Sequence, residues 1–172
     1  MEKLKIGVIG AGHLGGLHAK MFAEIKSAEL VGVYDIDASK ARSVGAAVKT
    51  KAFADLDDLV QSAEAVSVAA TTKAHFDIAM QALQAGRHVF IEKPITETIA
   101  QARELVATAR TKGLKIQVGH IERFNPAILA LEEYHLHPLF IESHRLAQFN
   151  PRGTDVAVVL DLMIHDIDLI LS

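Results

Sequence analysis

The sequence has no cysteine among its 172 residues. This absence excludes disulfide bonds, thiolate zinc sites and thiol nucleophiles. No apolar run reaches the roughly 18 residues of a membrane-spanning helix, and the first residues show no signal-peptide pattern. The net charge of −3 lacks the basic excess of nucleic-acid-binding domains. We therefore expect a globular, cytoplasmic protein that binds neither nucleic acid nor membranes.

Short apolar runs alternate with alanine-rich segments over residues 1–120. The runs are continuous and rich in β-branched residues, which is typical of buried parallel strands; they lie at 4–10, 30–35, 65–70, 88–92 and 115–120. The segments between them have apolar residues at three- and four-residue spacing and predict helices at 16–26, 38–47, 56–62, 74–85 and 97–112. A weak further strand is expected at 48–53. This order predicts an α/β fold with a doubly wound parallel sheet, a dinucleotide-binding Rossmann domain.

The pattern changes after residue 120. Residues 123–136 predict a helix, 138–149 an alternating strand and 155–172 a long apolar helix. A helix this apolar is expected to be buried. We interpret residues 121–172 as the start of a second, α+β domain for substrate binding or oligomerisation, too short for a self-sufficient core.

Residues 10–15 match the glycine pattern of dinucleotide-binding loops. Gly10, Gly12 and Gly15 follow the first predicted strand and open the first predicted helix, the context that this pattern requires. They would permit, in turn, a tight turn, the close approach of a pyrophosphate and the packing of helix on strand. With His13 and Leu14 they would hold the phosphates at the helix N-terminus. The alternative is a glycine turn that binds nothing.

Asp35 ends the second predicted strand and is followed by a second acid, Asp37. A carboxylate at this place can accept hydrogen bonds from the adenosine ribose hydroxyls. Two carboxylates would repel a 2′-phosphate, and no arginine follows the strand directly. The sequence therefore favours NAD over NADP as the cofactor.

Polar residues follow the third and fourth of these runs. Thr71 and His75 are predicted to face the nicotinamide half of the cofactor, because ligands bind outside the carboxyl ends of such strands. Alternatively, Thr72 caps a helix and His75 is a surface residue. Glu92 and Lys93, followed by a proline, end the next strand at the same edge. They would lie beside the nicotinamide, where Lys93 polarises or deprotonates a hydroxyl; the alternative is a surface Lys–Glu pair.

The last predicted helix carries a polar stripe of Asp161, His165 and Asp168. Asp161 and His165 could act as an orienting carboxylate and a general base, or as a core histidine held by an acid. Asp166 lies elsewhere on the helix and is expected to make a structural contact. The pair His135 and His137 lacks a carboxylate to complete a metal site, so we predict no metal.

Taken together, these motifs resemble the glucose–fructose oxidoreductase / inositol dehydrogenase (Gfo/Idh/MocA) family of nicotinamide-dependent sugar oxidoreductases. The resemblance covers the whole chain and rests on the glycine turn, ATTKAH, AGRHVFIEKPIT, VGHIERFNP and the D-x-x-x-H of DLMIH. It implies that His165 is the general base on the substrate hydroxyl, that Lys93 polarises the same oxygen and that Asp161 orients His165. A hydride would pass between the carbinol carbon and C4 of the nicotinamide.

Within the family, VGHIERFNPA and IHDIDL most resemble the branch that acts on UDP-N-acetylhexosamines. This resemblance implies that Arg123 and Asn125 lie near a sugar or nucleotide-sugar substrate and that the full-length form is a homo-oligomer. Family members are about twice this length, and their second domain walls the substrate site. The chain is therefore expected to be a fragment or truncated product, or to have this wall supplied by a partner. Two alternatives to a dehydrogenase remain: a non-catalytic NAD-binding module and a scaffold that has lost its ligand.

Overall fold

The computed structural model describes residues 2–131, 133–134, 137–145 and 157–172. The chain divides into two compact units, Met1–Val118 and Gly119–Ser172. The first unit is a sheet with helices, and the second contains only short helical segments among its described residues.

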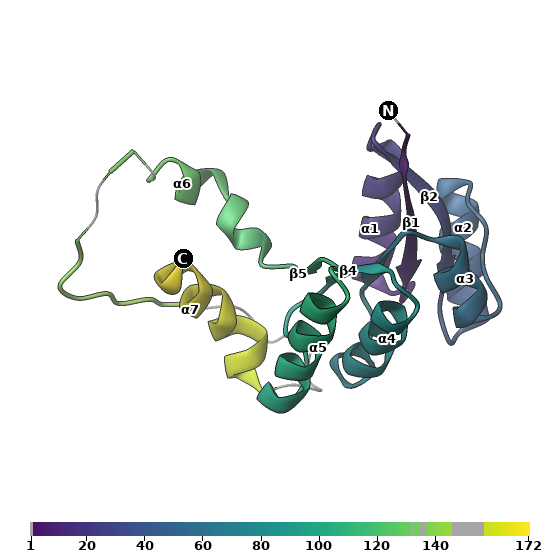
Figure 1. Ribbon diagram of the computed structural model, residues 1–172. Coiled ribbons are helices and arrows are strands. Elements are labelled where there is room, and N and C mark those ends of the chain that lie inside the picture. The colour runs from purple at the N-terminus through teal and green to yellow at the C-terminus, as the bar shows by residue number, and fades with distance from the viewer. Residues whose placement is uncertain (1, 132, 135–136, 146–156) are drawn as a thin grey trace. The chain divides into compact units, whose positions relative to one another are not determined.

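Five parallel strands form the sheet of the first unit, in the order β2-β1-β3-β4-β5 (Figure 1). They are β1 (Leu4–Ile9), β2 (Ala28–Tyr34), β3 (Ala65–Val68), β4 (His88–Ile91) and β5 (Ile116–Val118). Four of them lie within the predicted apolar runs, and β2 begins two residues before its predicted run of 30–35. The weak strand expected at 48–53 is reduced to a single parallel bridge between Ala52 and Val33 of β2. The predicted α/β Rossmann fold is confirmed.

The helices of this unit connect successive strands. They are α1 (His13–Glu24), α2 (Ala38–Val48), α3 (Leu56–Ser62), α4 (Thr72–Gln84) and α5 (Ile99–Thr111), and α4 and α5 lie side by side (Figure 1). All five predicted helices are present, with α1 and α4 beginning two or three residues earlier than expected. Gly86 and Gly113 follow α4 and α5 with positive φ angles of 79° and 66°, as predicted.

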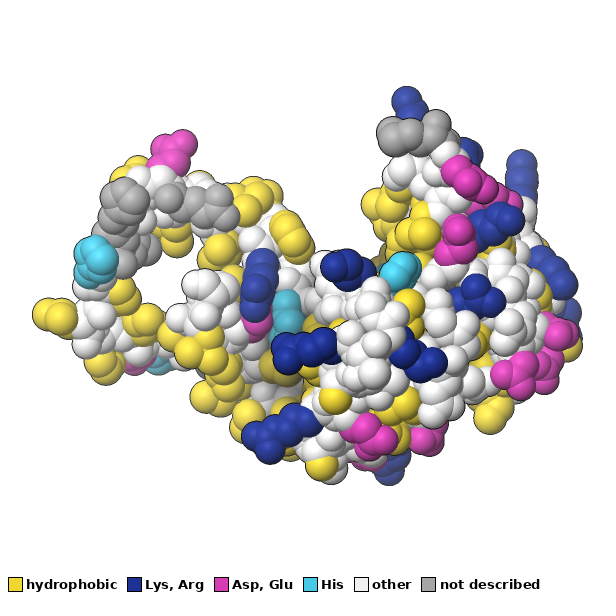
Figure 2. All heavy atoms as spheres, viewed as in Figure 1, with side chains coloured by type: hydrophobic (Ala, Val, Ile, Leu, Met, Phe, Trp, Pro, Cys, Tyr) yellow, Lys and Arg dark blue, Asp and Glu magenta, His cyan; other side chains and the backbone are white. Residues whose placement is uncertain are grey.

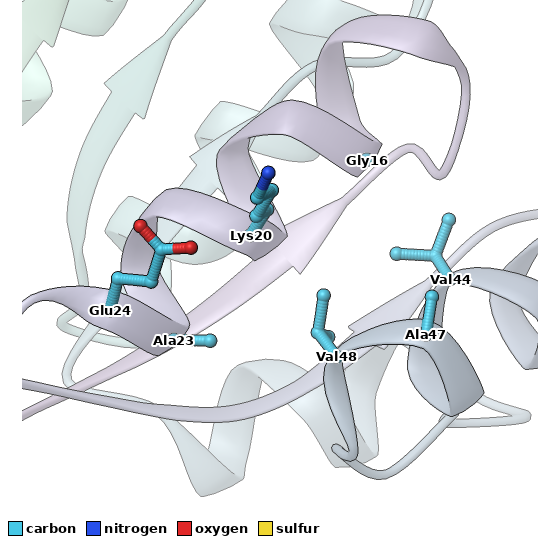
Figure 3. A pocket seen from close by; sticks show the side chains of 7 residues that line it. All are labelled: Gly16, Lys20, Ala23, Glu24, Val44, Ala47 and Val48. Atoms are coloured by element: carbon cyan, nitrogen blue, oxygen red, sulfur yellow. The ribbon is translucent and has the colours of Figure 1, made fainter.

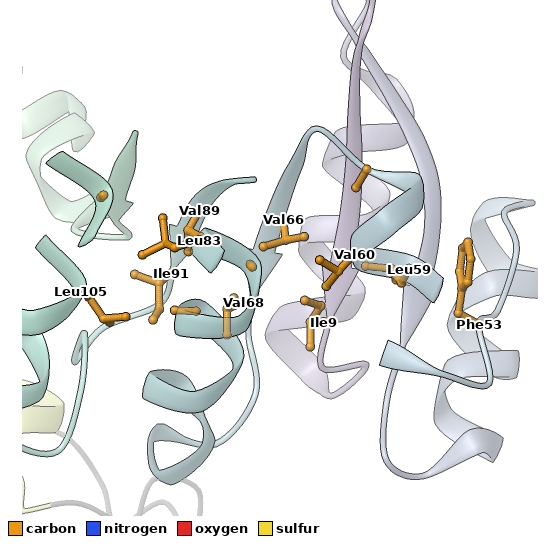
Figure 4. Close-up of a cluster of buried hydrophobic side chains, with 14 residues drawn as sticks. Ile9, Phe53, Leu59, Val60, Val66, Val68, Leu83, Val89, Ile91 and Leu105 are labelled. Atoms are coloured by element: carbon orange, nitrogen blue, oxygen red, sulfur yellow. The ribbon is translucent and has the colours of Figure 1, made fainter. Parts of the chain in front are cut away.

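Two hydrophobic clusters cover the two faces of the sheet. Neighbouring residues of a strand point to opposite faces, and accordingly Ile9 belongs to one cluster and Val8 to the other. The larger cluster packs the sheet against α3, α4 and α5, with Leu59, Leu83 and Leu105 fully buried (Figure 4). The smaller one packs it against α1 and α2 through small residues such as Ala19 and Ala41. The sheet is therefore doubly wound, and only its strand ends are open for a ligand.

The second unit differs from the predicted helix–strand–helix pattern. The helix expected at 123–136 is a 3₁₀ turn, η1 (Ile121–Phe124), followed by a single short helix, α6 (Pro126–Leu129). Pro126 lacks the N–H that a continuous helix needs, and Asn125 caps the new helix by accepting from Ala127 N at 3.0 Å. No strand forms among residues 138–145, so the prediction of a strand at 138–149 is wrong over its described part.

The predicted C-terminal helix begins with a π-helical segment, η2 (Val159–Met163), and continues as α7 (Ile164–Leu171). The expectation that it is buried is wrong, since Met163, Ile170 and Leu171 are 51, 49 and 80 % exposed. Figure 2 shows hydrophobic side chains gathered at the surface around α6 and α7. The other helical segments described in this unit are too short to cover the apolar sides of α7.

Candidate nucleotide-binding and catalytic site

The carboxyl ends of four strands meet at one edge of the sheet. The chain leaves β1 for β2 on one side and later enters β3 on the other, and ligands of such sheets bind where the strand order reverses in this way. Main-chain hydrogen bonds join the strand ends here: Gly10 N to Tyr34 O at 2.8 Å, Ala69 N to Ile9 O at 2.8 Å and Glu92 N to Val68 O at 3.0 Å. The glycine loop, Asp35, Thr71, Glu92 and Lys93 are all at this edge, as the sequence predicts.

The three glycines of the loop differ in what a side chain would meet. Gly10 has a φ of 95°, and a Cβ there would lie 2.6 Å from the main chain of Ala69. A Cβ on Gly15 would clash with the carbonyl oxygen of Gly10, whereas one on Gly12 would meet no atom within 4 Å. Gly10 and Gly15 are therefore required by the fold itself. Gly12 borders open space, which fits the close approach of a pyrophosphate.

The helices of the first unit differ in how their first turns are capped. A side chain caps α2, α3 and α5, namely Asp37, Asp55 and Thr98. No side chain caps α1 at Gly12 or α4 at Thr71, so the alternative in which Thr72 acts as a cap is wrong. The N–H groups at the start of a helix favour anions. The two helices without side-chain caps are thus the two that follow the neighbouring strands β1 and β3, where the strand order reverses.

Asp35 is bound to the glycine loop. Its Oδ2 accepts from Ala11 N at 2.6 Å, and its Oδ1 accepts from Asp37 N at 2.8 Å. A carboxylate has about four acceptor positions, so these two bonds leave capacity for ribose hydroxyls. Asp37 caps α2 by accepting from Ser39 N at 2.9 Å. The hydrogen bonds from the side chain and main chain of Ser39 hold the pKa of Asp37 below its ordinary value.

His75 lies under this edge and not on the surface. It is 1 % exposed, with Nδ1 at 2.9 Å from the carbonyl oxygen of Pro94 and Nε2 at 3.1 Å from that of Ala70. The ring therefore connects the loop after β3 with the turn after β4, in which the Lys93–Pro94 bond is cis. The surface alternative for His75 is wrong, and its proximity to a cofactor stays a prediction.

Glu92 has partners that sequence reasoning missed. Its Oε1 lies 3.1 Å from Nε2 of His18 in α1, whose Nδ1 lies 2.9 Å from Oγ of Ser67 in β3. Glu92 is 7 % exposed and Ser67 is fully buried. A serine within an otherwise apolar run was the available signal for this group. His18 and Glu92 are far apart in the sequence, so the spacing of residues along the chain gives no indication that they are in contact.

In the second unit, Arg123 and Asp168 form a bidentate ion pair. Nε and Nη2 of Arg123 donate to the two carboxylate oxygens at 2.7 and 2.5 Å, and His120 Nδ1 lies 3.7 Å from Asp168. The bond from Arg123 lowers the pKa of Asp168, with a smaller contribution from the charge of His120, and it raises the pKa of Arg123. The predicted role of Arg123 at the substrate stays a prediction, and His120 was missed.

Two further predicted residues of this unit lie on the helical stretch that carries Asp168. Asp161 is in η2 and His165 is in α7, both half-buried. The stripe shared with Asp168 was predicted for a continuous α-helix. A π-helical segment has more residues per turn, so the angular positions of Asp161 and Asp168 differ from that prediction. Asp166 binds Arg145, with Nη2 to Oδ1 at 2.8 Å, which confirms the expected structural contact and lowers the pKa of Asp166.

A pocket of about 340 Å³ lies between α1 and α2 (Figure 3). Its walls are mostly aliphatic, with Lys20 and Glu24 as its charged residues. It runs along the sides of the two helices and includes neither the glycine loop nor the turn after β4. The strand ends, with their open glycine and uncapped helices, are better suited to a dinucleotide than this pocket is.

Comparison with known proteins decides the family. The model of the oxidoreductase family with an NAD-binding Rossmann fold (Gfo/Idh/MocA) matches residues 4–120. The chain belongs to this family. The match covers nearly all of the first unit, which is therefore the NAD-binding Rossmann domain of this family. The resemblance noted from the sequence is confirmed.

Two curated relatives match nearly the whole chain. UDP-N-acetylglucosamine 3-dehydrogenase of Acidithiobacillus ferrooxidans is 42 % identical over 172 aligned positions, covering 99 % of this chain and 54 % of that protein. Inositol 2-dehydrogenase of Rubrobacter xylanophilus is 33 % identical over 177 aligned positions, covering 97 % and 51 %. The chain thus spans about half the length of the curated relatives it matches.

Solved structures agree with these matches. The structure of the A. ferrooxidans enzyme has a TM-score of 0.93, covering 99 % of this chain and 56 % of that one. GenD2 from gentamicin A biosynthesis, solved in complex with NAD, is 28 % identical with a TM-score of 0.74, covering 77 % of this chain and 39 % of that one.

In the described part of the chain, no helix is long and apolar enough to cross a membrane, and no group of three or more His, Asp or Glu side chains could hold a metal ion. His135, half of the histidine pair considered above, lies outside the described residues.

Proposed function

We propose that this chain is the cofactor-binding part of an NAD-dependent dehydrogenase that oxidises a secondary hydroxyl of a nucleotide sugar, with UDP-N-acetylhexosamines as the substrate class. The observation that carries the proposal is the shared edge of the sheet, where Gly12 borders open space beside the uncapped start of α1 and Lys93 follows β4. The substrate class rests on the 42 % identity to UDP-N-acetylglucosamine 3-dehydrogenase, which includes both units.

The residues around this edge fit NAD. The open space at Gly12 and the helix N-terminus accept a pyrophosphate, and the free acceptor positions of Asp35 suit the two ribose hydroxyls. Asp35 would be left facing a charge of its own sign in NADP, so we propose NAD as the preferred cofactor. When bound, NAD supplies the hydride acceptor at its nicotinamide ring.

The chain's own side chains have separate roles in this proposal. His165 removes the proton of the substrate hydroxyl as general base, and Asp161 orients the imidazole. Lys93 donates a hydrogen bond to the same oxygen and stabilises the negative charge that develops there. Arg123 and Asn125 are proposed to lie near the nucleotide sugar, with Asp168 holding the guanidinium of Arg123 in a fixed orientation.

A second candidate function is a non-catalytic NAD-binding module. It is favoured by one observation: these 172 residues span about half the length of their relatives, and taken alone they offer less protein to exclude water from a bound substrate. Both functions need the glycine loop and Asp35, whereas only the dehydrogenase needs Lys93 and His165. Variants of these two residues therefore distinguish the candidates.

The test follows the absorbance of reduced nicotinamide with NAD and a panel of UDP-sugars and free inositols. We expect oxidation of a UDP-N-acetylhexosamine by the wild-type chain and its loss in Lys93→Met and His165→Ala, with NAD affinity retained. Lys115→Met is the matched control, because Lys115 is exposed at the amino end of β5, the opposite edge of the sheet.

NAD binding without turnover of any panel member would support the second function. Turnover that persists unchanged in both variants would contradict the assigned roles. If calorimetry detects no binding of NAD at all, both functions fail.

A further inference from the structure

Three elements of the first unit converge on the imidazole of His18. The residue lies on α1, which begins at the glycine loop; its Nδ1 lies 2.9 Å from Oγ of Ser67 on β3 and its Nε2 lies 3.1 Å from Oε1 of Glu92 after β4. Phe90 contacts the imidazole edge to face, with ring centroids 5.6 Å apart. Phe90 thus restricts the orientation of the ring plane, and Ser67 and Glu92 bind its two nitrogens.

The hydrogen-bond chemistry gives this chain of groups a direction. A carboxylate only accepts, whereas a serine hydroxyl both donates and accepts. Nε2 must therefore carry a proton to bind Glu92, and Ser67 can donate to Nδ1 of the neutral ring. The same hydroxyl can accept from Nδ1–H of the protonated ring, so the bond to Glu92 is kept in either charge state.

Both oxygens of Glu92 are engaged by this arrangement. His18 holds Oε1, and Oε2 accepts from the main-chain N–H of Lys93 at 3.3 Å. In a carboxylate that is 7 % exposed, an oxygen left without a donor is costly. Without His18 we expect the Glu92 side chain to leave this position, and the turn that carries Lys93 would lose one of its attachments to α1.

We infer that His18, with Ser67 behind it, is a positioning residue that fixes the turn after β4 relative to the glycine loop by holding Glu92. The expected effect of His18 on NAD binding rests on the proposed function. The dinucleotide would span both places, with its pyrophosphate at the loop and its nicotinamide at the turn. A ligand such as ADP would need only the loop. His18 therefore matters for NAD affinity and not for ADP affinity.

Calorimetry with NAD and with ADP tests this difference in the full chain. We expect His18→Leu to weaken NAD binding about tenfold and to leave ADP binding unchanged. His18→Gln keeps an N–H donor near the position of Nε2 and should restore most of the NAD affinity. Lys20→Ala, an exposed site on the same helix, is the control and should bind both ligands as the wild type does.

Equal losses of NAD and ADP affinity in His18→Leu would overturn the inference, since they would indicate a general defect of the fold. Unchanged NAD affinity in that variant would overturn it as well. If His18→Leu does not fold, Ser67→Ala replaces it, because removing one buried hydroxyl leaves the packing of β3 nearly intact. This variant should weaken the binding of NAD and leave the binding of ADP unchanged.

The orientation of the ring is tested without any cofactor. At about pH 8, where histidine is ordinarily neutral, long-range ¹H–¹⁵N spectra of the wild-type chain should show His18 with its proton on Nε2. A proton on Nδ1 would sink the inference even if NAD binds. Conversely, a failure of the wild-type chain to bind NAD would contradict the proposed function and leave the spectrum to decide the role of His18.

Discussion

The carboxylate of Asp35 accepts the main-chain N–H of Ala11 at 2.6 Å, which joins the end of β2 to the glycine loop after β1. The residue predicted to select the cofactor is therefore also a support of the loop that would bind the pyrophosphate. Asparagine at this position would remove the charge and keep one acceptor oxygen for Ala11 N, while the bond from Asp37 N would be lost.

Substitutions at Asp35 should separate cofactor choice from loop support. In Asp35→Asn we expect NADP affinity to rise and NAD affinity to fall by less than about tenfold, since repulsion of a 2′-phosphate is removed while the acceptor for Ala11 remains. Asp35→Ala should weaken NAD binding further, because the loop loses its support. Calorimetry with both cofactors measures the change, and Asp77→Asn on the exposed side of α4 is the control. Unaltered NAD-to-NADP selectivity in both variants would contradict the assignment.

Gly12 and Gly15 form a matched pair for alanine substitution. Gly12→Ala should fold normally, because its Cβ enters open space, yet it should abolish NAD binding by occupying the place of the pyrophosphate. Gly15→Ala should instead lose stability, since its Cβ meets the carbonyl of Gly10. Overpacking of this kind costs roughly 1–3 kcal/mol, and each kcal/mol lowers the Tm of a chain this size by about 2–4 °C. Thermal melts and calorimetry of both variants check the pair; a normal NAD affinity in Gly12→Ala would exclude this loop as the phosphate site.

His75 is expected to act through the fold. His75→Leu removes the donor between the carbonyls of Ala70 and Pro94, and leaving a buried acceptor unpaired costs roughly 1–3 kcal/mol. We expect a lower melting temperature, with His144→Leu, an exposed histidine, as the control. A variant with the melting temperature of the wild type and no NAD binding would show instead that His75 contacts the cofactor.

The ion pair of Arg123 and Asp168 predicts that the stability of the second unit depends on pH. Because the hydrogen bonds from Arg123 lower the pKa of Asp168 below its usual 3.8, the stabilisation is complete above pH 3.8 and is lost as the pH falls through the lower folded value. An NMR titration of the Asp168 carboxyl carbon should give a midpoint below 3.8, and Arg123→Leu should move it upward. A midpoint that is the same with and without Arg123 would show that the pair does not form in solution.

Much of the first unit could be predicted from the sequence because its signals are local. Continuous β-branched runs mark buried strands, and a glycine pattern between strand and helix marks the nucleotide loop. The second unit was predicted less well. The apolar spacing across residues 123–136 obscured the break at Asn125-Pro126, although a capping residue before a proline is itself a helix start.

The sequence by itself determined the alternation of strands and helices, the glycine loop and the position of Lys93 at a strand end, since each depends on residues within one turn or one strand. Only the tertiary structure decided how the side chains of this edge are held. His18, Ser67 and Glu92 come from three elements, and His75 reaches carbonyls on two loops. These contacts follow from the order of strands in the sheet and the packing of α1 and α4 on it, which spacing along the chain does not encode.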